Sequence, residues 1–159
     1  MTLVQVWSAP GCPVPRLEWA QWLSRMLSEA VAAPERVCSV PECHDAKRKL
    51  CARHHEALVE LAVMHDAEIA ELNAAHLGCA GPTNILSFPA APEESGLGVL
   101  AFGLETWLRE AALYGQKPEL HAQRLLAHGL AHLLGHDHGP EMDACCLFLL
   151  GGGFPFSEG

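Results

Sequence analysis

The sequence predicts an α+β fold in which helices cover a small mixed β-sheet, and three observations support this prediction. Half of the 159 residues are apolar and 18% are charged, a balance that suits one domain with a packed core. Short apolar runs occur early and in the middle of the chain, and longer segments with helical periodicity flank them. No apolar run approaches about eighteen residues, so we expect no membrane span.

The first half of the chain contains one clear strand and one clear helix. Residues 2–7 alternate and include β-branched side chains, which predicts a strand. Residues 16–32 place apolar side chains at helical spacing and end before Pro34, which predicts an amphipathic helix. Pro41 precedes a charged segment that we interpret as a helix. The apolar run 58–64 fits either a helix or a strand.

The second half is easier to divide. Asp66 suits the N-cap of a helix that reaches residue 76. Pro89 closes a short strand. Glycines end the helices that follow. The remaining expected elements are strands at 85–88 and 99–102 and helices at 104–114, 118–134 and 140–150.

The overall charge argues against a protein that binds nucleic acid through a positive net charge. The chain has ten Lys and Arg and nineteen Asp and Glu, which gives a net charge of −9. Any contact with RNA or DNA therefore needs a local basic patch. Lys47, Arg48, Lys49 and Arg53 are clustered, and the simplest interpretation of this cluster is a solvated helix face.

The cysteines favour free thiols. Seven cysteines are irregularly spaced, and no basic residue precedes Arg16 to suggest a secretion signal. We therefore expect reduced thiols in the cytoplasm. A zinc site is a weaker alternative for one group, because no CxxC pair is present. Its members are Cys38, Cys43, His44 and Cys51.

The segment with the clearest chemistry is His128–His138. His128 and His132 are four residues apart and point the same way on a helix. Gly135 suits a left-handed turn that ends the helix, after which His138 can return as a third ligand. The spacing HxxxHxxGxxH is that of a three-histidine zinc site with an open position for water. We therefore expect one zinc ion held by these three side chains.

The neighbouring polar residues have weaker assignments. His136 is a substitute ligand if His138 points away, and Asp137 either supports the turn or orients a ligand histidine. His121 is assigned to the surface or rim. Gly129 occupies the position where zinc peptidases of the HExxH type place their glutamate, so a peptidase would lack its base.

Two motifs together resemble the YbeY family of zinc-dependent endoribonucleases, the rRNA maturation factors of bacteria. Residues 128–138 match the pattern HGxxHLxGxDH, and residues 82–89, PTNILSFP, resemble the family segment PTNVLSFP. The resemblance covers roughly residues 58–150. It implies a domain over 1–150 with an insertion at 35–57, and we expect a flexible tail at 151–159.

The resemblance also implies a function and a site. The function is single-strand-specific, metal-dependent RNA cleavage in the cytoplasm, in rRNA maturation at the 3′ end of the small-subunit RNA and in ribosome quality control. The implied partners are RNA and the small ribosomal subunit. The implied zinc ligands are His128, His132 and His138. Asn84 and Ser87 would lie near the metal. The alternatives are that Asn84 caps a turn and that Ser87 only satisfies backbone groups.

Three departures from the family pattern put activity in doubt. Leu77, Gly81 and Val99 stand where the family usually has Arg, Lys and Asp, and a guanidinium beside the metal is a natural partner for a phosphodiester. One alternative is therefore a catalytically impaired, ribosome-associated zinc-binding module. A second is a zinc hydrolase for a small substrate. A nuclease should show Arg or Lys near the metal, whereas a small-molecule hydrolase should show a closed, mostly apolar pocket. Residues 47–49 could partly replace the lost cations.

Overall fold

The computed structural model describes residues 4–37, 44–51 and 58–151. Eleven elements are defined within these ranges. The strands are β1 (Val4–Ser8), β2 (Val59–Met64), β3 (Ile85–Pro89) and β4 (Gly98–Gly103). The helices are α1 (Arg16–Ala32), α2 (Pro34–Val37), α3 (His44–Cys51), α4 (Asp66–Leu77), α5 (Leu104–Leu113), α6 (Pro118–Leu133) and α7 (Pro140–Leu149).

The four strands form one mixed sheet, which confirms the predicted α+β class. Their order is β1-β2-β4-β3, with β1, β2 and β4 parallel and β3 antiparallel to β4. The ambiguous run 58–64 is therefore largely a strand, and it lies at the centre of the sheet. Strand β3 occupies an edge, which leaves its outer side available to neighbouring elements.

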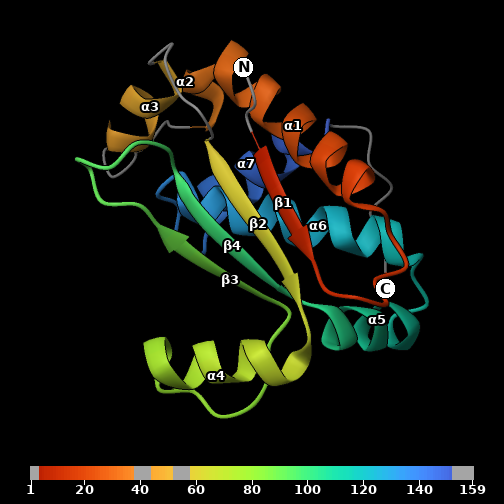
Figure 1. Cartoon of the computed structure of the whole chain (residues 1–159). Coiled ribbons are helices and arrows are strands. Elements are labelled where there is room, and N and C mark those ends of the chain that lie inside the picture. Colours follow the sequence, from red (N-terminus) through yellow and green to blue (C-terminus); the bar gives the residue numbers. More distant parts are fainter. Residues whose placement is uncertain (1–3, 38–43, 52–57, 152–159) are drawn as a thin grey trace.

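The two faces of the sheet carry different cores. Leu61 and Val63 of β2 belong to the main cluster, whereas Ala62 and Met64 belong with a smaller one, as expected for side chains that alternate across a strand. Helices α1, α6 and α7 contribute to the main cluster, and α6 and α7 pass behind the strands in Figure 1. Helix α4 supplies Ile69 to the smaller cluster.

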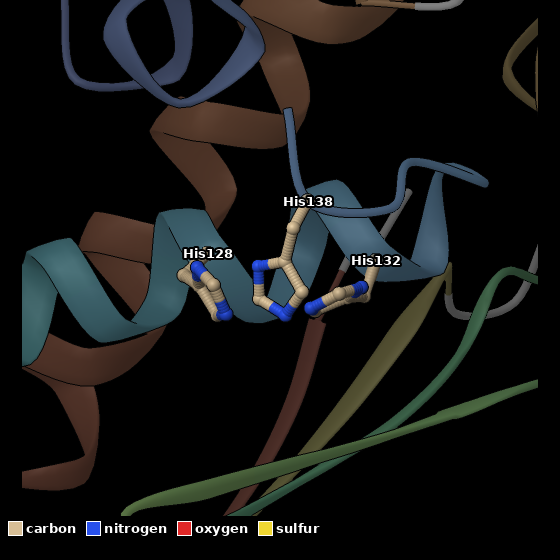
Figure 2. Close-up of side chains that lie close together, drawn as sticks. All are labelled: His128, His132 and His138. Atoms are coloured by element: carbon tan, nitrogen blue, oxygen red, sulfur yellow. The ribbon is translucent and has the colours of Figure 1, made fainter. Parts of the chain in front are cut away.

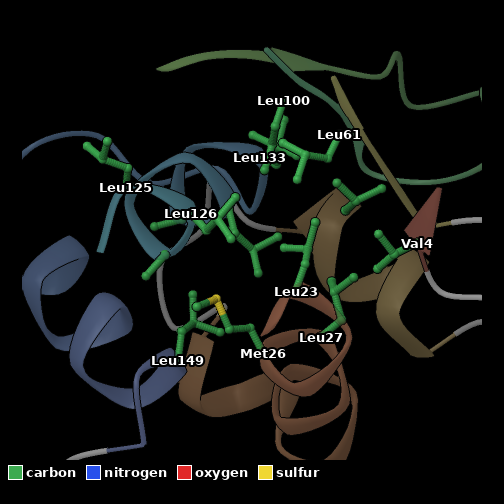
Figure 3. Close-up of a cluster of buried hydrophobic side chains, with 14 of the residues drawn as sticks. Val4, Leu23, Met26, Leu27, Leu61, Leu100, Leu125, Leu126, Leu133 and Leu149 are labelled. Carbon is green, nitrogen blue, oxygen red and sulfur yellow. The ribbon is translucent and has the colours of Figure 1, made fainter. Parts of the chain in front are cut away.

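The main core is dense and rich in aromatic and leucine side chains. Trp19, Phe102 and Trp107 are fully buried and meet edge to face, with ring centroids 4.8–5.6 Å apart. Figure 3 shows leucines of α1 and α6 interleaved beneath the sheet, among them Leu23 and Leu126. This packing fixes α6, the helix that carries two of the predicted ligands.

One predicted cap is wrong. His65, not Asp66, occupies the N-cap of α4. Asp66 is the first helical residue, and its carboxylate accepts hydrogen bonds from the backbone N–H and hydroxyl of Thr106 and from Arg109. The side chain that was expected to cap its own helix therefore joins α4 to α5.

The basic cluster is only partly a solvated face. Lys49 is buried, and its Nζ donates to the carbonyl of Ala91 at 2.8 Å. Arg48 donates to the carbonyl of Pro92 at 2.9 Å. Both cations thus tie α3 to the loop between β3 and β4. Arg53, Cys38, Cys43 and the tail from residue 152 lie outside the described residues, as does the side chain of Lys47. The domain limits, the insertion and the tail remain predictions.

Two further expectations concern thiols and membranes. Cys12, Cys79, Cys145 and Cys146 form no disulfide, which agrees with the predicted thiols for these four. Every helix in the described segments is too short or too polar to traverse a bilayer.

Candidate metal centre

Helix α6 presents one side to the core and the other to a cavity. Leu126 and Leu130 are fully buried in the main cluster. His121, Arg124, His128 and His132 instead line a cavity of about 870 Å³. These positions recur every three to four residues, so they form one continuous stripe along the helix.

The end of α6 brings the three predicted histidines together. The N–H of Gly135 donates to the carbonyl of His132, and the N–H of His136 donates to that of Ala131. Gly135 has a φ of +96°, so the helix ends in the left-handed turn predicted from the sequence, with the paired bonds of a Schellman motif. The chain then turns back and places His138 beside the helix.

The three imidazoles converge. One ring nitrogen from each of His128, His132 and His138 lies within 4.8 Å of the others. The ring centroids are 4.8–5.5 Å apart, and Figure 2 shows the rings gathered in one space beside α6. Three ring nitrogens that lie this close together could hold one metal ion.

The surrounding backbone holds two of these residues in place. The Nδ1 of His132 lies 3.0 Å from the carbonyl oxygen of His136. A carbonyl only accepts, so Nδ1 carries the proton and Nε2 keeps a lone pair for a metal. The Asp137 carboxylate accepts the N–H of His138 at 2.8 Å, so Asp137 supports the turn that carries His138.

The surroundings of His128 favour its neutral imidazole. Burial lowers the pKa of His128, and the nearby His132 and His138 lower it further. A neutral ring offers its lone pair, and three such nitrogens suit zinc or another borderline transition metal. The donor set therefore fits a metal, although it does not select zinc over its neighbours in the series.

His136 is engaged elsewhere. Its side chain is buried, and its Nε2 contacts the carbonyl of Val37 at the end of α2. The substitute-ligand role considered for His136 requires His138 to point away, and His138 instead joins the group.

The cavity runs between the edge strand β3 and helix α6. Residues 84–89 of β3 and its approach form one wall, and α6 forms another. The helix approaches the sheet closely at Gly129, where an added Cβ would lie 2.6 Å from Cδ1 of Ile85. Gly129, which stands where HExxH peptidases have their glutamate, is therefore packed against β3.

Asn84 and Ser87 both line this cavity and both have partners in the fold. The Asn84 amide donates to the Glu110 carboxylate at 3.1 Å, and its oxygen accepts the N–H of Ile85. The Ser87 hydroxyl donates to the carbonyl of Gly129 at 3.0 Å. Each side chain thus has the local bonding role weighed in the sequence analysis, and a role toward substrate stays a prediction.

His121 is not at the surface as expected, and Arg124 is a cavity residue that was not predicted. His121 is buried, with 7% of its surface exposed, and its Nε2 lies 3.1 Å from Glu110. Arg124 lies on the cavity wall four residues before His128. The signal was available, because residues 121, 124 and 128 share a helical face, but the opposing wall of β3 was needed to show that this face borders a cavity.

The three residues that depart from the family pattern have different surroundings. Leu77 lies on the cavity wall and is 60% exposed. Gly81 has a φ of +85° in the turn before β3, where an added Cβ would meet nothing within 4 Å. Val99 lies in β4 and lines a different, smaller hollow over the sheet. Only Leu77 therefore lines the cavity beside the histidines.

Comparison with known proteins places this geometry in a family. A family model described as endoribonuclease YbeY matches residues 29–149. The chain belongs to the YbeY family. The match includes the three histidines and residues 82–89, so the resemblance seen in the two motifs extends over most of the chain.

Curated members of the YbeY family show how far the similarity reaches. A protein of Oleidesulfovibrio alaskensis named endoribonuclease YbeY is 47% identical over 110 residues, covering 55% of this chain and 65% of its own. One of the same name from Lawsonia intracellularis is 33% identical over 145 residues, covering 91% and 88%. The chain therefore spans 65% of the first relative's length. A Thermotoga maritima solution structure aligns with a TM-score of 0.48 and 19% identity, covering 94% and 91%.

Proposed function

We propose that this chain is a metal-dependent endoribonuclease that cuts single-stranded RNA, with His128, His132 and His138 as the metal ligands. The convergence of the three ring nitrogens beside a cavity carries the proposal. Relatives at 33–49% identity that bear the name endoribonuclease support it.

The residues on the cavity wall suit an anionic substrate. None of the described lining residues is a carboxylate, although the chain has nineteen acidic residues. Arg124 and four histidines line the cavity instead. A wall that carries one permanent positive charge and no described carboxylate, beside a metal site, suits a phosphodiester.

The chain's own residues would position the reaction. A bound zinc ion supplies Lewis acidity, which lowers the pKa of water toward ~7 and stabilises charge on a phosphate. The carbonyl of His136 holds His132 in one tautomer, and Asp137 braces the His138 loop. With no carboxylate among the described lining residues, no side-chain general base is assigned.

We further propose that the substrate is ribosomal RNA. The cellular role would be maturation of the 3′ end of the small-subunit RNA and ribosome quality control in the cytoplasm. Family membership supports this assignment, and the small subunit would be the partner.

Leu77 supports a second candidate. It occupies the cavity wall at the position where the resemblance implies an arginine. A chain that lost this cation would bind metal and the ribosome yet cut RNA poorly, because losing one transition-state donor costs about 10²–10³ in rate.

An RNA cleavage assay separates the two candidates. The purified full chain, loaded with zinc, is incubated with single-stranded RNA, the matching duplex, and small-subunit RNA with an extended 3′ end. We expect cleavage of the single strand and of the extension, and loss of cleavage in His132→Ala. His65→Ala is the control, since His65 pairs with Glu105 and does not line the cavity.

Two outcomes would contradict the nuclease proposal. Intact RNA in the presence of fully loaded protein would favour the impaired module, and co-sedimentation with small subunits would then be measured. Equal cleavage by His132→Ala and wild type would show that the activity does not come from this site.

A further inference from the structure

Arg124 lines the wall of the cavity and is close in sequence to the histidine group. It lies on α6 four residues before His128, so the two side chains share a face and their Cα atoms are separated by about 6 Å along the helix axis. An arginine side chain can span one helical turn. Its guanidinium is thus in reach of any group that contacts the histidines.

The composition of the cavity wall singles out Arg124. Among the described residues that line this cavity it is the one Lys or Arg, and the end of α4 contributes the apolar Leu77. The basic side chains of α3 do not substitute for it, since Arg48 and Lys49 donate to carbonyls of the loop between β3 and β4. In a chain of net charge −9, a permanent positive charge on this wall is a specific feature.

The chemistry of the side chain points to phosphate. Guanidinium stays charged at any physiological pH, and its planar fork matches two oxygens of one phosphate. An RNA strand lying along the cavity would pass the stripe formed by His121, Arg124 and His128. A phosphate held at the histidine group would therefore lie within one helical turn of Arg124.

We propose that Arg124 binds the phosphodiester that lies against the three-histidine centre. The assignment rests on the proposed nuclease function, and it makes Arg124 a catalytic residue that touches the reacting group. Its charge would offset the negative charge that develops on the phosphate oxygens during cleavage.

The first test measures binding without cleavage. Zinc-loaded wild type, Arg124→Gln and Arg124→Lys are titrated with a short single-stranded 2′-O-methyl RNA, whose integrity is checked after each titration. We expect Arg124→Gln to bind about tenfold more weakly, the size of a lost charge-assisted hydrogen bond. The slope of log affinity against log salt should fall by about 0.7, as for one lost phosphate contact. Arg124→Lys should keep the slope.

The second test measures cleavage by the same samples under single-turnover conditions. Arg124→Gln should cut about 10²–10³-fold more slowly with its metal content unchanged, and Arg124→Lys should recover part of the rate. Arg16→Gln is the matched control, because Arg16 is exposed at the start of α1 and does not line the cavity.

The outcomes separate this proposal from the nuclease proposal. If wild type cuts RNA and Arg124→Gln matches Arg16→Gln in rate, affinity and salt slope, the role of Arg124 is overturned while the nuclease stands. If no protein cuts RNA but Arg124→Gln still loses affinity and slope, the nuclease fails and the phosphate contact stands. Loss of metal in Arg124→Gln would overturn the assignment, because Arg124 would then be needed to maintain the structure of the metal site.

Discussion

Asp66 illustrates how a single side chain can link two helices. Its carboxylate accepts hydrogen bonds from the N–H and hydroxyl of Thr106 and lies 3.0 Å from the Arg109 guanidinium. Burial raises the pKa of Asp66, but the bonds from Thr106 and Arg109 outweigh it, and the net pKa is lowered. The ionised form is therefore favoured in the folded state.

This lowered pKa predicts a pH-dependent contribution to stability. A carboxyl whose folded pKa lies below its unfolded value stabilises the protein fully above the unfolded pKa, and the contribution is lost as pH falls through the folded pKa. We expect the free energy of unfolding of wild type to exceed that of Asp66→Asn near neutral pH by about 1–3 kcal/mol. The difference should shrink below about pH 4.

Urea unfolding across this pH range makes the comparison. Glu71→Gln serves as control for removal of one negative charge from α4, since Glu71 is exposed. A difference between wild type and Asp66→Asn that is constant with pH would contradict the account.

The histidine group could be predicted from sequence because its determinants are local. Helical spacing aligns His128 with His132, and Gly135 permits the turn that returns His138. The bonding of Asn84 to Glu110 and the burial of His121 depend on segments distant in sequence. No periodicity within one helix reveals such partners.

At the scale of elements, the approach to β3 is fixed by a glycine at the end of β4. The N–H of Gly103 donates to the carbonyl of Asn84 at 2.7 Å. An added Cβ at this position would lie 2.2 Å from the carbonyl oxygen of Thr83. The segment that carries Asn84 to the cavity is therefore packed directly against the β4 backbone.

Replacing Gly103 with alanine should displace this segment. We expect Gly103→Ala to lower the free energy of unfolding by about 1–3 kcal/mol or more, because the obstacle is backbone rather than a flexible side chain. Gly81→Ala is the comparison, as it meets no neighbour and introduces only the positive-φ penalty, about 1 kcal/mol. Chemical denaturation gives both values, and unchanged stability in Gly103→Ala would contradict the packing.

Most element boundaries could be predicted to within a residue or two, since prolines, glycines and periodicity are local signals. The contacts of the basic helix α3, which was itself predicted, could not. Lys49 and Arg48 bind carbonyls of residues 91 and 92, more than forty positions away. A basic helix that is held by such contacts has the same local pattern as a solvated one.

At the scale of the whole molecule, the described cavity wall differs in composition from the chain as a whole. Nineteen acidic residues give a strongly negative chain, yet none of the described residues lining the cavity is acidic. The sequence predicts a mixed sheet with helices, but strand order and the placement of β3 at the edge follow from long-range pairing. The cavity between β3 and α6 is a consequence of that placement.

The central claim is that His128, His132 and His138 hold one metal ion, and metal content tests it most directly. The protein is saturated with zinc, dialysed, and analysed for metal per chain. We expect about one ion in wild type and its loss in His128→Ala, His132→Ala and His138→Ala. His76→Ala should keep the ion, because His76 lines the same cavity but lies outside the group. Wild type without metal, or His138→Ala with a full complement, would contradict the account.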